Sequence, residues 1–188
     1  MIGNQTNWSQ RFGKRISQKR KNNLIGSQGY HSNKDFRRPI SGFYETKTFM
    51  KLNNKTISLL QNEAKEIRST VLSMIVSAHA SHIAPSYSIV ELLVYLYGKI
   101  LTINPKKPLE QNRDRFLLSK GWGISALYAV LARKGFFNEK ELKEYCTDGS
   151  RLIGIATFNG TPGIEASTGS IGHGLPIGIG MALGMRLQ

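Results

Sequence analysis

A three-then-four spacing of apolar residues runs from Ile57 to Ala78. Its members are Ile57, Leu60, Ala64, Ile67, Val71, Met74 and Ala78. This is the period of an α-helix with one apolar face. Glu63 and Glu66 fall on the other faces. The pattern therefore predicts an amphipathic helix whose apolar side packs on a core.

A second amphipathic helix is predicted to begin at Ser88 and to end at Asn104-Pro105. Ser88 and Glu91 have the spacing of a capping box, in which each side chain bonds the other residue's backbone N–H. Pro85 is expected to interrupt the chain before this helix. The predicted apolar face comprises Ile89, Leu92, Leu93, Leu96 and Ile100.

A strand, a turn and a helix are predicted between residues 116 and 134. The short apolar run Phe116-Leu117-Leu118 is typical of a buried strand. Residues 124–134 have helical spacing, and Gly135 is a suitable C-terminal stop. Asn138, followed by Glu141, predicts one more capped helix start.

The last 40 residues are predicted to form a loop and then a buried helix. Glycines crowd residues 161–176, where they allow positive φ and close approach of a ligand. An ordinary, tightly packed loop is an equal alternative. From about Leu175 the chain is apolar nearly all round, with Gly178, Gly180 and Gly184 allowing close helix packing. Because no cap or stop precedes Gln188, we expect the polypeptide to be cut inside this element.

The net charge of +14 is unevenly distributed. Residues 1–49 carry ten Lys and Arg against two Asp and Glu, without a sustained apolar period. We expect a disordered basic tail there, followed by an ordered region over residues 50–188. The tail could be a nucleic-acid-binding arm, an organelle transit peptide or a dispensable extension with Met50 as the start. The last is favoured, because ordered patterning begins just after Met50.

Composition excludes several classes of protein. A single cysteine, Cys146, rules out an intramolecular disulfide and a Cys-rich zinc site. We expect it to be a buried thiol in a reducing compartment. Residues 69–90 and 166–185 lack charge but contain too many polar residues and glycines to span a membrane. With no secretory signal visible, a cytoplasmic protein is expected.

Two places before helices could carry chemistry. His79 and His82 are three residues apart, but a metal would need more ligands, and a surface or capping role is favoured. Gly121, Trp122 and Gly123 open a helix, where backbone N–H groups and the helix dipole suit a phosphate. This turn matches neither the Walker loop nor the Gly-x-Gly-x-x-Gly loop, so the pattern by itself is weak evidence for phosphate binding.

Taken together, these segments resemble the N-terminal, diphosphate-binding part of transketolases over roughly residues 67–187. Residues 161–176 carry the most specific match, and residues 112–121 and 126–131 also match well. The resemblance implies an α/β thiamine diphosphate-binding fold, a parallel sheet with helices on both faces, incomplete in this chain. It also implies thiamine diphosphate with Mg²⁺ as the cofactor.

The resemblance also implies a set of site residues. His82 corresponds to a histidine that faces the sugar substrate, and His173 lies near the cofactor and the substrate. Both are candidate catalytic residues, because imidazole exchanges protons near pH 7. The implied cofactor-binding residues are Gly121, Trp122, Gly123, Gly169, Ser170, Ile171 and Gly172.

The chain departs from the family pattern in four places. Trp122 stands where the family has a histidine near the diphosphate, and an indole offers one N–H donor. Ala84-Pro85 replaces a glycine-rich stretch, and Ile155-Ala156 stands where another histidine is frequent. The chain also stops before the family's Gly-Asp-Gly segment and later Asn, which hold Mg²⁺. No metal-ligating residue is therefore expected here.

Three hypotheses follow. The favoured one is the N-terminal portion of a transketolase-type enzyme that transfers a two-carbon ketol unit between sugar phosphates. It would be inactive alone and would need complementary transketolase parts, in a homodimer or heterotetramer, without nucleic acid or membrane. The alternative is a non-catalytic remnant or interaction protein that retains the fold. A nucleic-acid-binding module is the least favoured.

Overall fold

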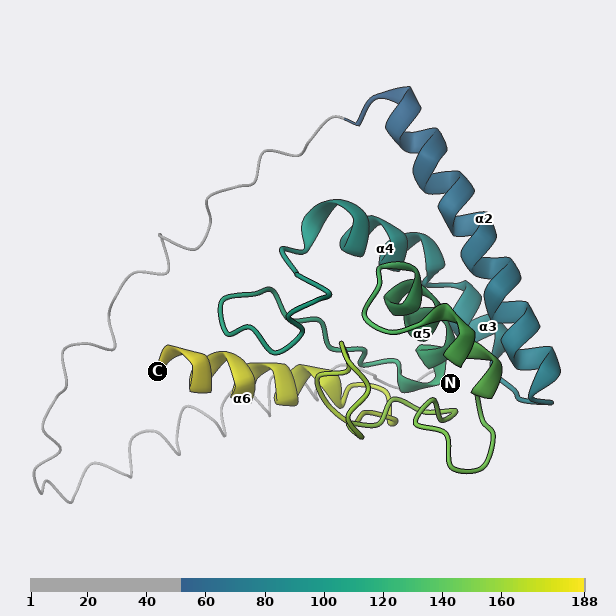
Figure 1. The fold of residues 1–188 in the computed structure, drawn as a ribbon. Helices are drawn as coiled ribbons and strands as arrows, with labels where there is room; N and C mark the ends of the chain where they lie inside the picture. Colours follow the sequence, from purple (N-terminus) through teal and green to yellow (C-terminus); the bar gives the residue numbers. More distant parts are fainter. Residues whose placement is uncertain (1–51, 188) are drawn as a thin grey trace, which may run out of the picture. The chain divides into compact units, whose positions relative to one another are not determined.

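A computed structural model describes residues 52–187 of the chain (Figure 1). These residues belong to a compact unit that spans Lys51–Gln188. The interpretations offered for residues 1–49 fall outside the described range.

The first predicted helix is confirmed as α2, Asn54–Ser77. Its N-cap is Asn53, whose side-chain oxygen accepts the N–H of Thr56 at 2.8 Å. This bond satisfies one of the four amides that a helix start leaves without an intrahelical partner. Four members of the predicted apolar side are buried, namely Ala64, Ile67, Val71 and Met74, and Ile75 is buried beside them. Ile57, at the start of the predicted side, is exposed.

The second predicted helix is shorter than expected, a separate short helix precedes it, and its predicted cap is wrong. A short helix α3, Ile83–Tyr87, contains Pro85 in its first turn, where a missing N–H costs nothing. Ser88 ends α3 and donates its hydroxyl to the carbonyl of Pro85 at 3.0 Å, so it does not cap the next helix.

Helix α4, Val90–Tyr95, follows and passes into a single π-helical turn, η3, Leu96–Ile100. The residues that face the core are Val90, Leu93, Val94 and Tyr97. Leu92, placed on the apolar face from sequence, is 55% exposed. The true face therefore lies slightly to one side of the predicted one.

Helix α5, Ile124–Arg133, is the centre of the fold. It packs against α2, α3, α4 and the short 3₁₀ helix η5, Glu139–Glu144. Residues 124–132 are all buried. The predicted stop is confirmed, since Gly135 has φ of 84° directly after the helix. The predicted cap at Asn138 is confirmed too, with the reciprocal bond from Glu141, although the helix that follows is 3₁₀.

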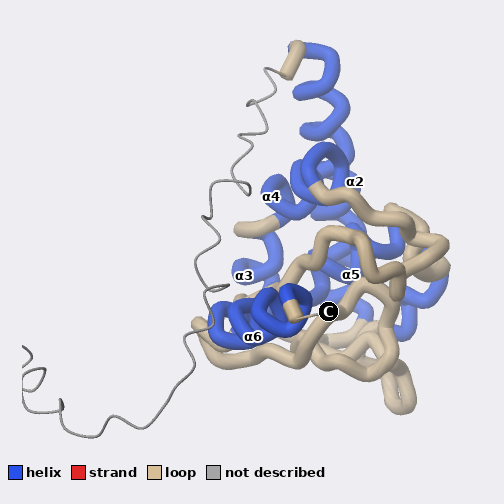
Figure 2. Tube along the Cα trace, turned by 90° about the vertical axis from the view of Figure 1, so that its left-hand side faces the viewer, coloured by secondary structure: helices blue, strands red, loops and turns tan. Residues whose placement is uncertain are grey.

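The described residues contain helices and loops but no β-strand (Figure 2). Phe116, Leu117 and Leu118, predicted as a buried strand, lie in a loop. A strand is defined by backbone pairing with a neighbour, and no other segment of residues 52–187 pairs with this one. The predicted parallel sheet is therefore not confirmed by the structure.

The last helix is confirmed as α6, Gly174–Arg186, but the prediction that it is buried is wrong within the described part of the chain. Only Gly174 is buried, and no atom lies within 4 Å of the position that a side chain would take at Gly178, Gly180 or Gly184. Figure 1 shows α6 at the margin of the folded unit, away from α2. Near its end, Arg115 donates an N–H to the sulfur of Met185 at 3.3 Å.

Two further expectations can be compared with the structure. Cys146 is exposed rather than buried, at a position with φ of 57° where the chain leaves η5. Among residues 52–187, no helix has the length and apolar character needed to cross a bilayer.

Candidate functional site

The two glycine-rich turns singled out in the sequence lie against each other. The short 3₁₀ turn η4, Gly121–Gly123, opens helix α5. A Cβ at Gly121 would come within 2.5 Å of the Thr168 carbonyl oxygen and 3.0 Å of the Gly169 Cα. Only glycine permits this approach. Backbone therefore meets backbone where the two predicted cofactor-binding segments join.

Side-chain and backbone bonds hold the second loop in this place. Thr168 is buried, and its hydroxyl donates to the carbonyl of Leu118. Its N–H donates to the carbonyl of Ala156 at 2.9 Å. Six residues on, the N–H of Gly174 donates to the Ser119 hydroxyl at 3.0 Å. The loop from residue 168 to 174 is thus attached at both ends to the segment before η4.

Between these attachments the backbone offers unused donors. Within the described part of the chain, the N–H groups of Gly121, Trp122 and residues 169–172 make no hydrogen bond. Gly123 differs, because its N–H donates to the carbonyl of Lys120 at 2.8 Å. Free amides beside a helix start are suited to an anion such as a diphosphate. The residues present therefore fit the diphosphate group that the sequence resemblance implied.

His82 and Trp122, forty residues apart, are in contact. Their ring centroids are 4.4 Å apart and the ring planes are inclined by 24°, which is a stacked arrangement. The Ser81 hydroxyl lies 2.6 Å from Nδ1 of His82. His82 precedes α3 and has φ of 75°. It occupies the N-cap position of α3, but its side chain makes no cap bond.

Helix α3 is fixed against the start of α5, which places His82 beside the glycine turns. The hydroxyls of Ser86 and Ser125 are both buried and lie 2.7 Å apart. A Cβ at Gly123 would come within 2.7 Å of Ile89. The Lys120 ammonium donates a hydrogen bond to the Ser88 hydroxyl at 2.6 Å. These contacts join α3, α4 and η4 into one surface.

The sequence pattern did not reveal a buried ion cluster under the loop. Glu165 forms ion pairs with Arg113 and Arg115, the second at 3.1 Å. The side chains of Arg113 and Glu165 are only 8% and 7% exposed. Both residues lie inside the segments that carried the resemblance, but nothing in their spacing indicated pairing. Burial and the neighbouring Glu165 carboxylate also raise the pKa of Tyr97 well above its ordinary value.

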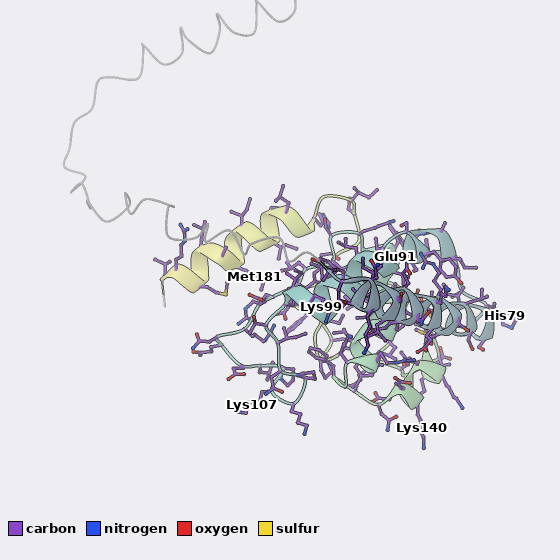
Figure 3. The ribbon with its side chains drawn as sticks, turned by 90° about the horizontal axis from the view of Figure 1, so that it is seen from above. His79, Glu91, Lys99, Lys107, Lys140 and Met181 are labelled. Atoms are coloured by element: carbon purple, nitrogen blue, oxygen red, sulfur yellow. The ribbon has the colours of Figure 1, made fainter. Side chains whose placement is uncertain are left out.

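The remaining predicted site residues are exposed. Ser170, Ile171, Gly172 and His173 lie on the outer side of the loop, and Ile171 is 87% exposed. The His173 side chain makes no hydrogen bond or ring contact with the described residues. In Figure 3, His79 lies at the end of α2 that is away from Met181 of α6. Nowhere in residues 52–187 do three His, Cys, Asp or Glu residues gather as a metal would require.

The fold and these loops define a class, a domain that presents a glycine-lined, donor-rich surface at the start of a central helix. Residues 60–188 match the model of the transketolase thiamine diphosphate binding domain. The chain is 37% identical over 132 residues to an apulose-4-phosphate transketolase subunit from Phocaeicola vulgatus, covering 70% of this chain and 47% of the relative. It is 39% identical over 129 residues to the 6-deoxy-6-sulfo-D-fructose transketolase subunit SqwG from Clostridium, covering 69% and 47%.

A solved structure agrees with these matches. Transketolase from Leishmania mexicana is similar at a TM-score of 0.62 and 28% identity, over 66% of this chain and 19% of that one. The chain therefore belongs to the transketolase family, as its N-terminal thiamine diphosphate-binding domain. It spans about half the length, or less, of the curated relatives that it matches.

Proposed function

We propose that this chain is the diphosphate-binding portion of a transketolase-type transferase that moves a two-carbon ketol unit between sugar phosphates. The observation that carries the proposal is the contact between Gly121 and residues 168–169, which brings two sets of unused backbone donors together. As part of this proposal, the fold of the complete enzyme is a parallel sheet with helices on both faces.

The free amides of Gly121, Trp122 and residues 169–172 would hold the diphosphate. When bound, thiamine diphosphate supplies the nucleophilic carbon and the electron sink for cleavage of the ketose. His82 and His173 would exchange protons with sugar hydroxyls. For His82 the atom available is Nε2, because the Ser81 hydroxyl lies at Nδ1.

The described residues do not fit a magnesium site, since they hold no cluster of metal-ligating side chains. We therefore assign no step to Mg²⁺ on this chain and propose that a complementary transketolase part supplies its ligands. The same part would supply the pyrimidine-binding domain. Homodimeric and heterotetrameric assemblies both satisfy this requirement, in the cytoplasm and without nucleic acid.

Helix α6 is the proposed contact surface for that part. Leu175, Ile179 and Leu183 are each more than half exposed along it, and Leu175 is 70% exposed. A soluble domain rarely leaves so many large apolar residues together in water. The relatives named as subunits are about twice as long as the matched region, so a covering polypeptide of transketolase origin is the occupant that we propose.

The decisive experiment compares the chain alone with the chain co-expressed with a complementary transketolase part that carries the pyrimidine-binding domain and the magnesium ligands. Ketol transfer between sugar phosphates is assayed with thiamine diphosphate and Mg²⁺. We expect turnover from the assembly only. Turnover by the chain alone would contradict the need for a partner, and an inactive but correctly formed assembly would contradict the proposed enzyme.

Co-purification tests the contact surface separately. Leu183→Glu should weaken capture of the partner, because a carboxylate would enter an apolar interface. Leu59→Glu is the matched control, since Leu59 is also more than half exposed but lies on α2, away from α6 (Figure 1). Equal capture by both variants would exclude α6 from the interface.

One observation favours the second candidate, a non-catalytic interaction protein. Trp122 occupies the place of a histidine that the resemblance assigns to the diphosphate, and its indole is stacked on His82. Isothermal titration of the assembly with thiamine diphosphate separates the candidates. Binding supports the enzyme, and partner capture without cofactor binding supports the interaction protein.

A further inference from the structure

We propose that Trp122 is a positioning residue that holds the His82 imidazole with Nε2 free for a sugar hydroxyl. This proposal rests on the proposed function. It changes the role of Trp122 from contact with the diphosphate through its side chain to control of a neighbouring histidine.

Two contacts restrict the His82 ring. The Ser81 hydroxyl at 2.6 Å engages Nδ1, and the indole of Trp122 covers one face at a centroid distance of 4.4 Å. Together they oppose rotation of the ring about both side-chain torsions. Among the described residues Nε2 has no partner, so it is the ring's one polar atom available to a ligand.

The backbone fixes the histidine side of this pair. His82 has φ of 75° and ψ of 33°, a left-handed conformation that is uncommon for a residue with a Cβ. Such a conformation persists only where its surroundings hold it. Here α3 begins at the next residue and is attached to α5 through the buried Ser86 and Ser125 hydroxyls.

The tryptophan side is fixed as well. Trp122 lies between two glycines whose missing side chains let the turn pack directly on Thr168 and Ile89. The indole therefore extends from a turn that cannot shift without breaking backbone packing. An indole has a single N–H and no titratable group. What it offers the imidazole is therefore its large aromatic face, on which the ring stacks.

Nuclear magnetic resonance on the labelled full-length chain tests the proposal directly. His82 is one of four histidines, and its signals are assigned with His82→Asn. We expect nuclear Overhauser contacts between the indole and the imidazole, and an upfield ring-current shift of the His82 ring protons. Trp122→Phe should retain an upfield shift and show contacts from its phenyl ring to the imidazole. Trp122→Leu should lose the shift and move both imidazole ¹⁵N resonances toward the averaged values of a mobile ring.

Leu109→Ala, in an exposed loop, is the control and should leave every His82 signal unchanged. Absence of the Overhauser contacts in the unmodified chain would overturn the proposal even if Trp122→Leu fails to fold. Unchanged ¹⁵N resonances in a folded Trp122→Leu chain would overturn it equally. Turnover of the partnered assembly tests the proposed function separately. An inactive assembly in which Trp122 still stacks on His82 would refute the proposed function but not the pairing of the two rings.

Discussion

Replacing Gly121 by alanine should separate the two glycine turns. The new Cβ would lie 2.5 Å from the Thr168 carbonyl oxygen, whereas ordinary van der Waals contact begins at 3.4 Å. The obstacle is backbone on both sides, so no side-chain rotation can relieve it. One of the two segments must move by roughly 1 Å.

The expected cost follows from what that movement disturbs. Overpacking a well-packed position costs about 1–3 kcal/mol. The displaced loop would also weaken the Thr168 N–H bond to Ala156, now 2.9 Å long, and a net hydrogen bond is worth about 1 kcal/mol. We therefore expect Gly121→Ala to lower the free energy of unfolding by about 2–4 kcal/mol.

Urea denaturation of the full chain, followed by far-ultraviolet circular dichroism, measures this change. At a slope of about 2 kcal/mol per molar urea, the midpoint should fall by roughly 1–2 M. Gly184→Ala is the matched control, because no atom lies within 4 Å of its new Cβ. It should be neutral or stabilising by up to about 1 kcal/mol, since alanine favours a helix. A Gly121→Ala midpoint equal to that of the unmodified chain would refute the backbone contact between the turns.

Two other outcomes follow from buried charge and buried phenols. Glu165→Gln leaves the Arg113 guanidinium buried without its ion partner, so the free energy of unfolding measured in urea should fall by about 3–5 kcal/mol. The control Glu141→Gln breaks a more exposed pair and should lower it by under about 1 kcal/mol. Equal losses would contradict the burial of the Glu165 cluster. Burial raises the pKa of both Tyr97 and Tyr128, so unfolding exposes phenols that ionise more readily than in the fold. The free energy of unfolding should therefore be constant below about pH 10 and fall above it by roughly 1.4 kcal/mol per pH unit for each phenol. Tyr97→Phe should remove the part of this pH dependence that Tyr97 contributes. A urea midpoint that does not change from pH 9 to 11 would exclude the effect.

The helices could be predicted from sequence where burial alone decides them. The period that defines α2 matches most of its buried face, and Gly135 and Asn138 end and begin elements as their backbone chemistry requires. Pro85 shows where the sequence misleads. A proline predicts an interruption of helical structure, but the first turn of α3 accommodates Pro85, because that position needs no N–H.

The tertiary features of the site were not predictable in this way. No local pattern states that Trp122 will stack on His82 or that Glu165 will pair with Arg113, because each contact depends on how distant segments meet. The burial predicted for α6 depended on a neighbour that residues 52–187 do not supply. Whether residues 116–118 form a strand similarly depends on a second segment that can pair with them.

The loop of residues 161–176 contains two kinds of residue, and they carry different information about descent. Thr168 and Gly174 are held by bonds to the segment before η4, so a protein that had abandoned catalysis would still need them to fold. Ser170, Ile171 and His173 face outward, and their side chains make no bond in the described chain. Mutation could replace those three at little cost to folding. Their persistence among relatives of this chain would therefore record selection for a ligand, whereas persistence of Thr168 or Gly174 would record only selection for a fold.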